Sequence, residues 1–158
     1  MKNSEIDIAQ KLIRCKSIAP NDAGTLKIVE RECKSIGFKC TKLKFSEKGF
    51  DTIGNLYAEI GSGKPHFSFA GHVDVVPANK KEWAVDPFAG KIRNNFLHGR
   101  GAVDMKSAIA CFISSARSYL EENKNFKGKI SLLITSDEET WAINGTKKIL
   151  KWLKKKKI

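Results

Sequence analysis

The stretch KISLLITSDEE, residues 129–139, indicates the class of fold. Its first seven residues are almost continuously apolar, as expected of a β-strand that is covered on both faces. The segments on either side of it alternate between strand and helix patterns, which is typical of layered α/β domains. We therefore predict an α/β domain with a mixed, partly parallel sheet. Directly after the strand come three acids, Asp137, Glu138 and Glu139.

The spacing of apolar residues predicts the helices of this domain. The clearest pattern starts at Met105 and ends at Leu120, where apolar residues recur at i, i+3, i+4 and i+7 and form one buried face. Asp104 stands at the start of this segment, where a carboxylate is a common N-cap. The other predicted helices cover residues 4–18 with Ile6, Ala9, Leu12 and Ile13 facing inward, residues 26–36 with Gly37 as the C-terminal cap, and a segment from Asn144 into the lysine-rich end.

Alternating apolar and polar residues predict the remaining strands. We expect strands at residues 38–45, 55–60 and 66–71, with a loop from Gly49 to Gly54 between the first two. Asn94 and Asn95 predict a short hairpin turn, because asparagine readily adopts the left-handed conformation that such turns need.

The size and composition of the chain favour one soluble domain. Its 158 residues are 41% hydrophobic, so we treat residues 1–158 as a single unit with a substantial core. The opening MKNSEIDIAQKLIR carries acids where a leader peptide needs an apolar stretch, and no later run approaches membrane-spanning length. We therefore expect a cytoplasmic protein without a membrane partner. The four cysteines form no C-x-x-C pair, and we expect free thiols.

The formal net charge of +12 raises the possibility of a nucleic-acid partner. Of the 29 Lys and Arg residues, however, seven lie after Thr146 with no acid among them, so the lysine tail accounts for more than half of the excess. Such a tail is either a solvated end or an anion-binding patch. No aromatic residues interleave with the lysines as in a base-stacking surface, and we predict no specific nucleic-acid partner.

Candidate site residues cluster where predicted strands end. His72 and Asp74 come just after the strand at 66–71, and the acids at 137–139 follow the strand at 129–135. In α/β sheets, ligands gather outside the carboxyl ends of the strands. The predicted topology brings both clusters and Asp104 to one edge of the sheet. Taken singly, each of these groups has a structural alternative. His72 and Asp74 could be a polar strand end, the acids at 137–139 a polar strand-to-helix loop, and Asp104 the N-cap of the helix that follows it.

Together, these side chains suit a metal-dependent hydrolase. Histidine supplies a neutral nitrogen ligand, and carboxylates can bind one zinc ion or bridge two. Asp74 is placed to accept the second N–H of His72 and thereby to fix its tautomer. Of two adjacent glutamates, one can bind metal while the other serves as a general base for water.

Ordered motifs along the chain then become recognisable. They are SIAPNDAG at 17–24, GHVDVVP at 71–77, W-x-x-x-P-F at 83–88, GRGAVDMK at 99–106 and SDEE-x-x-x-x-NGT at 136–146. This series closely resembles the succinyl-diaminopimelate desuccinylase family, whose members are co-catalytic zinc amidohydrolases. Acetylornithine deacetylases, aminoacylases and zinc carboxypeptidases share the ligand pattern.

The resemblance implies a role for each candidate. His72 would bind one zinc ion, Asp104 would bridge two, and Glu139 would bind the second. Glu138 would be the general base, and Asp74 would orient His72. The implied cofactor is Zn²⁺, two per site, with Co²⁺ as a possible substitute. The implied reaction is hydrolysis of N-succinyl-LL-2,6-diaminopimelate to succinate and the free diamino acid.

The chain also departs from the family pattern. Family members are more than twice as long and carry a further carboxylate ligand, a late histidine ligand and a lid domain that supplies dimer contacts. The remaining histidines here, His66 and His98, match no ligand position. We therefore predict the N-terminal part of a zinc-peptidase-like catalytic domain, truncated and without the lid and dimerisation domain.

Several alternatives stay open at this point. The chain is either a hydrolase acting on a small N-acyl amino acid or an inactive, metal-binding fragment of the same fold. A related deacylase such as an acetylornithine deacetylase is a further alternative. Exposed strand edges would favour a homo-oligomer. Arg100, between two glycines, either contacts an anion or braces the turn.

Overall fold

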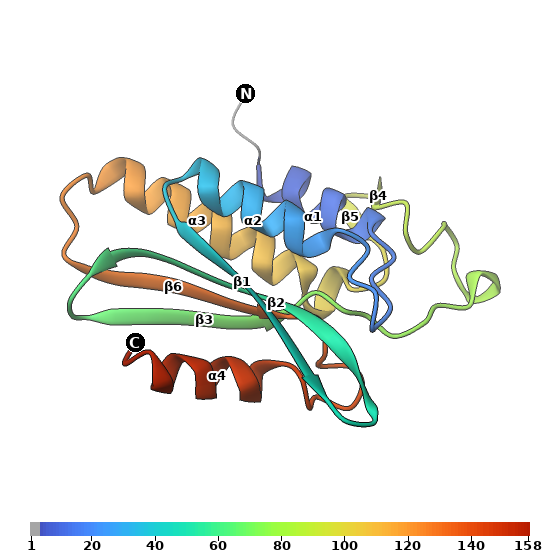
Figure 1. Cartoon of the computed structure of the whole chain (residues 1–158). Helices are drawn as coiled ribbons and strands as arrows, with labels where there is room; N and C mark the ends of the chain where they lie inside the picture. The colour runs from blue at the N-terminus through green and yellow to red at the C-terminus, as the bar shows by residue number, and fades with distance from the viewer. Residues whose placement is uncertain (1–3) are drawn as a thin grey trace.

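A computed structural model describes residues 4–158. The first three residues of the opening segment, for which we predicted no leader peptide, lie outside the described residues. The chain forms a layered α/β domain, with α1, α2 and α3 on one face of a sheet and α4 on the other (Figure 1). The helices are α1 at Glu5–Arg14, α2 at Thr25–Ser35, α3 at Ser107–Glu122 and α4 at Thr146–Lys155. Within residues 4–158, no helix is both long and apolar enough to cross a membrane.

The main sheet has the strand order β1-β2-β6-β3. The pairs β1–β2 and β2–β6 are antiparallel, whereas β3 and β6 are parallel, so the predicted mixed, partly parallel sheet is confirmed. Its strands are β1 at Lys39–Glu47, β2 at Phe50–Ser62, β3 at His66–His72 and β6 at Gly128–Thr135. A separate hairpin pairs β4 at Lys91–Arg93 with β5 at Phe96–His98.

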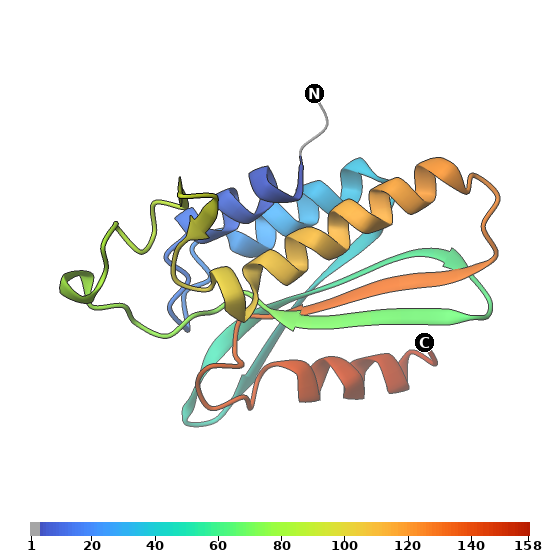
Figure 2. The same ribbon diagram turned by 180° about the vertical axis from the view of Figure 1, so that it is seen from behind.

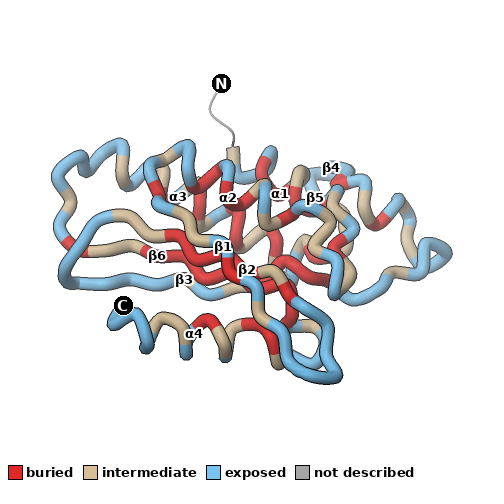
Figure 3. The backbone as a smooth tube through the Cα atoms, viewed as in Figure 1, coloured by how far each residue is buried: buried red, intermediate tan, exposed pale blue. Residues whose placement is uncertain are grey.

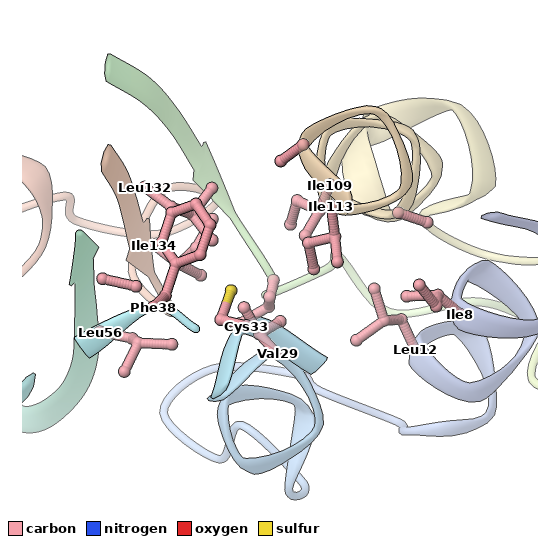
Figure 4. Packing of buried hydrophobic residues seen from close by; sticks show 14 of the residues in the cluster. Ile8, Leu12, Val29, Cys33, Phe38, Leu56, Ile109, Ile113, Leu132 and Ile134 are labelled. Carbon is pink, nitrogen blue, oxygen red and sulfur yellow. The ribbon is translucent and has the colours of Figure 1, made fainter. Parts of the chain in front are cut away.

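Strand β6 is covered on both faces, as its apolar sequence predicts. Leu132 and Ile134 belong to the large core under α1, α2 and α3, which Figure 4 shows in close-up. Leu133 points the other way and packs with Ile149 of α4 and Tyr57 of β2. Buried backbone accordingly concentrates between the layers (Figure 3).

The predicted helix at 4–18 is too long. It ends at Arg14, because Cys15 adopts an extended conformation and its N–H closes the last turn on the Leu12 carbonyl. The residues that follow contact the end of β3 instead, where the Ser17 hydroxyl donates to the Val73 carbonyl at 2.6 Å. Ile6, predicted to face inward, is 47% exposed, and Ile8 takes its place in the core.

Turns show one wrong prediction and one confirmed one. We predicted a loop at 49–54, but β2 already starts at Phe50. It pairs with β1 across a tight turn at Lys48 and Gly49. Gly49 supplies the positive φ of +87° that this turn requires. Asn94 and Asn95 have φ of 51° and 63°, and the predicted hairpin joins β4 to β5 there. All four cysteines are free, as predicted.

Two isoleucines of α1 test which face of this helix is buried. Ile8→Ala should lower the free energy of unfolding by about 2–5 kcal/mol, because it leaves a cavity in the core. Ile6→Ala, in the same helix but exposed, should change it by less than about 1 kcal/mol. Urea unfolding of both variants measures the difference. Equal losses would contradict the packing of α1.

Candidate metal centre

The site lies where β3 and β6 end side by side. In their parallel pairing, His72 is the partner of Thr135, and the Val73 N–H continues the ladder to the Thr135 carbonyl at 2.9 Å. The segments 72–74 and 136–139 therefore leave the sheet at the same edge. Figure 2 shows that β3 also ends beside the turn that leads into α3, the segment of Asp104. The predicted meeting of the three clusters is thus what the topology produces.

His72 is buried and held from both ring nitrogens. Its Nδ1 lies 3.1 Å from the Asp74 carbonyl oxygen and 3.5 Å from the Asp74 carboxylate, and its Nε2 lies 3.0 Å from Asp104 Oδ1. Burial by itself lowers the pKa of His72, but the hydrogen bonds to Asp74 and Asp104 outweigh it and raise the pKa to about 9. Below this pKa both ring nitrogens carry a proton, and Nε2–H donates to Asp104 Oδ1.

Asp74 connects the histidine to the two glutamates. Its Oδ2 accepts the backbone N–H groups of Glu138 and Glu139, each at 2.9 Å. Its Oδ1 is buried, and the residues described offer it no hydrogen-bond partner, with His72 Nδ1 at 3.5 Å. Burial alone raises the pKa of Asp74, but His72 and the two amides hold the pKa below its ordinary value. The carboxylate therefore stays charged and fixes both segments.

The two glutamates face His72 together. One ligand atom each of His72, Glu138 and Glu139 lie within 4.8 Å of one another, and Glu138 Oε2 is 3.9 Å from His72 Nε2. Burial raises the pKa of Glu139. The charge of His72 lowers it, but the charges of Asp104, Glu138 and Asp74 raise it, and the pKa stays above its ordinary value. Because carboxylates crowd around one imidazole, a divalent cation would relieve their repulsion. The donor set of one nitrogen and several carboxylate oxygens fits such an ion.

Asp104 is not the N-cap of α3, so that alternative is wrong. Helix α3 starts at Ser107 and has no side-chain cap, whereas Asp104 lies in the preceding turn, η2 at Ala102–Lys106, with an extended φ of −121° and ψ of 99°. Its side chain is 73% exposed and reaches the site through His72 Nε2. It is not a member of the tight group formed by His72 and the glutamates.

A hollow of about 310 Å³ opens in front of these groups. His72, Asp104 and Glu138 line it, with Thr146 at the start of α4. Asp104 and Glu138 therefore face a solvent-accessible hollow.

Lys106 supports the site and was not predicted from the sequence. Its side chain is fully buried, and Nζ donates to the carbonyls of Leu12 and Cys15 at 2.9 and 2.8 Å, at the end of α1. Burial lowers its pKa to about 8. The contacts tie the segment of Asp104 to α1, and Ser17 ties the same region to the end of β3. Only its place in the GRGAVDMK motif could have singled it out.

Arg100 has the contacts of a brace. Its guanidinium lies over the Trp83 ring at 5.4 Å from the centroid, and Nη2 approaches the Pro77 carbonyl at 3.5 Å. These contacts favour the bracing interpretation over the anion contact.

Asp74→Asn tests the link between histidine and glutamates. The substitution preserves the shape of the side chain, but the amide nitrogen cannot accept a hydrogen bond. It would therefore face a donor, either the N–H groups of Glu138 and Glu139 or Nδ1 of His72. The free energy of unfolding should fall by about 1–3 kcal/mol in metal-free buffer, measured by urea unfolding. Asp86→Asn is the control, because Asp86 accepts the Phe88 N–H at the surface and its loss should cost about 0–1 kcal/mol. A smaller loss for Asp74→Asn would contradict the link.

With this geometry established, comparison with known proteins places the chain. The family model described as peptidase family M20/M25/M40 matches residues 68–158, more than half of the chain. The chain belongs to this peptidase family. This confirms the family membership that the sequence motifs predicted.

Curated relatives of the chain are desuccinylases. Succinyl-diaminopimelate desuccinylase of Pelagibacter ubique (strain HTCC1062) is 51% identical over 155 residues, which are 98% of this chain and 40% of the relative. The enzyme of the same name from Parvibaculum lavamentivorans is 51% identical over 149 residues, 94% of this chain and 37% of the relative. The chain thus spans about two fifths of the length of these relatives.

Solved structures confirm the fold class. Human carnosine dipeptidase 1 has a TM-score of 0.79 at 19% identity and covers 95% of this chain and 35% of its own. An M20 family metallo-carboxypeptidase from Sulfolobus solfataricus has a TM-score of 0.75 at 22% identity and covers 96% and 34%. The family thus includes metal-dependent peptidases. At these sequence identities, the structural similarity shows only that the fold is shared.

Proposed function

We propose that residues 1–158 form the N-terminal part of the catalytic domain of a zinc-dependent succinyl-diaminopimelate desuccinylase. Its reaction would be hydrolysis of the amide of N-succinyl-LL-2,6-diaminopimelate to succinate and LL-2,6-diaminopimelate. The observation that carries this proposal is the convergence of His72, Asp104, Glu138 and Glu139 at one sheet edge, in a chain 51% identical to enzymes of that name.

The side chains divide into ligands and supporting groups. His72 Nε2, Asp104 and Glu139 would hold the metal ions, while Asp74 keeps Nδ1 of His72 turned inward. Bound zinc would lower the pKa of water from about 15.7 toward about 7 and polarise the amide carbonyl. Zn²⁺, two per site, is the proposed cofactor, and Co²⁺ is the expected substitute.

Glu138 is the proposed general base. Its carboxylate is 56% exposed, lines the hollow and comes within 3.9 Å of His72 Nε2. A carboxylate in this position can accept the proton of the attacking water and deliver it to the leaving amine. Its backbone N–H donates to Asp74, and this bond fixes the point from which the side chain extends.

The second candidate is a metal-binding fragment without turnover. The chain spans about two fifths of the relatives' length, so turnover by residues 1–158 alone is tested separately from metal binding. A related deacylase such as an acetylornithine deacetylase is the further alternative, and its substrate differs in both the acyl group and the amino acid. We further propose a cytoplasmic location and a small N-acyl amino acid as partner, and we retain a homo-oligomer formed through the outer edge of β3.

Metal binding is tested first with two histidine variants. Zn²⁺ should raise the melting temperature of the wild-type chain, and His72→Gln should weaken Zn²⁺ binding at least about 10-fold, measured by calorimetric titration. His66→Gln is the matched control, since His66 lies at the other end of β3 and contacts Ser131. Equal affinities for both variants would remove the proposed centre.

The roles of the two glutamates are separable. Glu138→Gln should lower zinc-dependent succinate release by about 10²–10⁴-fold while zinc affinity stays within a few-fold. Glu139→Gln should weaken zinc binding itself. Glu122→Gln, at the far end of α3, serves as control. A chain that binds zinc but releases no succinate identifies the metal-binding fragment, and one that binds no zinc contradicts both candidates.

A further inference from the structure

The loop that carries the two glutamates is closed by a buried carboxylate. Asp137 is only 4% exposed, and the residues described place no Lys, Arg or His in an ion pair with it. Its Oδ1 accepts the Thr140 hydroxyl at 2.6 Å and the Ala142 N–H at 3.2 Å, and its Oδ2 accepts the Asn144 N–H at 2.8 Å. A buried carboxylate is thus satisfied entirely by its own loop.

These bonds return the chain to the sheet within a few residues. Ala142 adopts a positive φ of 53°, which costs conformational energy and persists only where surrounding contacts enforce it. Asn144 then anchors the far end of the loop, since its carbonyl accepts Asn55 Nδ2 at 3.0 Å and its own Nδ2 donates to the Asp51 carbonyl at 2.8 Å. The start is fixed by the Asp137 N–H, which donates to Thr135 Oγ1 at 3.1 Å.

Gly145 shows how closely the loop end packs against its beginning. A Cβ at this position would lie 2.6 Å from Thr135 Oγ1 and 2.7 Å from the Asp137 carbonyl oxygen. Both ends of the loop therefore meet at the end of β6, and the Asp137 carboxylate bonds to residues 140, 142 and 144 of the same loop.

Glu138 and Glu139 thus sit between two carboxylates. On one side, Asp74 accepts both of their N–H groups, and on the other, Asp137 closes the loop directly behind them. Because the direction of a side chain follows its backbone, a loosened loop would let both glutamates turn away from His72. We propose that Asp137 is a positioning residue for this pair, a role that rests on the proposed function in so far as the glutamates serve a metal centre.

The test uses Asp137→Asn in the whole chain. The variant keeps the shape but replaces one accepting oxygen by an NH₂ group, which opposes one of the loop donors. Amide hydrogen exchange at Glu138 and Glu139 should accelerate at least about 10-fold, because their bonds to Asp74 open more often. Affinity for Co²⁺ alone should fall about 10–100-fold, with a changed visible absorption spectrum of the bound ion.

A matched control separates positioning from stability. Asp22 also accepts a backbone N–H, that of Leu26 at the start of α2, and makes no hydrogen bond to residues 137–144. Asp22→Asn should lower the stability of the chain but leave exchange at Glu138 and Glu139 and the Co²⁺ spectrum unchanged. If Asp137→Asn fails to fold, Thr140→Val replaces it, because it removes only the 2.6 Å bond and keeps the carboxylate.

The outcomes distinguish this inference from the proposed function. Wild-type exchange rates at Glu138 and Glu139 in the Asp137 or Thr140 variant overturn the positioning role, as does an equal acceleration in Asp22→Asn. A wild-type chain that binds no Co²⁺ contradicts the proposed function, and the exchange rates, which need no metal, still decide whether Asp137 holds the pair.

Discussion

Parallel pairing between β3 and β6 is the constraint on which the rest of the site depends. It sets His72 opposite Thr135, so the chain leaves both strands at one level of the sheet. A shift of two residues along either strand would separate the imidazole from the glutamates by about 6.6 Å more, beyond the reach of a shared ion. Burial excludes a shift of one residue, because Leu132 and Ile134 must face α1 to α3 while Leu133 faces α4. Core packing thus limits the registers that are open to the site.

The parts of the molecule that follow from local patterns could be predicted from the sequence. The apolar run at 129–135, the stripe on α3 and the asparagine turn each have a single physical cause, either burial or backbone conformation. The failures involve contacts between distant segments. Gly54 suggests a loop, yet it lies within β2, where an added Cβ would come within 3.1 Å of Leu26 Cδ1. Lys106 is buried against two carbonyls of α1, and no hydrophobicity pattern anticipates a lysine in that position.

The candidate site shows the same division. Strand ends located His72, Asp74 and the glutamates, because the edge of a sheet follows from topology. The local conformation of Asp104 did not follow, since the segment before α3 is not helical and no periodicity describes it. The connection from Asp74 to the Glu138 and Glu139 amides also lies beyond sequence reasoning, because a side chain that bonds to backbone groups 64 and 65 residues away leaves no local signature.

The molecule as a whole is positively charged, whereas the site is acidic. The chain carries a net charge of +12, yet Asp74, Asp104, Glu138 and Glu139 surround one imidazole. On α4, Ile149 and Trp152 pack against the sheet, whereas Lys147, Lys151, Lys154 and Lys155 are exposed. Local repulsion among the acids is met in the free protein by a proton on His72, whose pKa rises to about 9. A divalent cation could replace that proton and neutralise more of the charge, so the crowded carboxylates would favour metal binding.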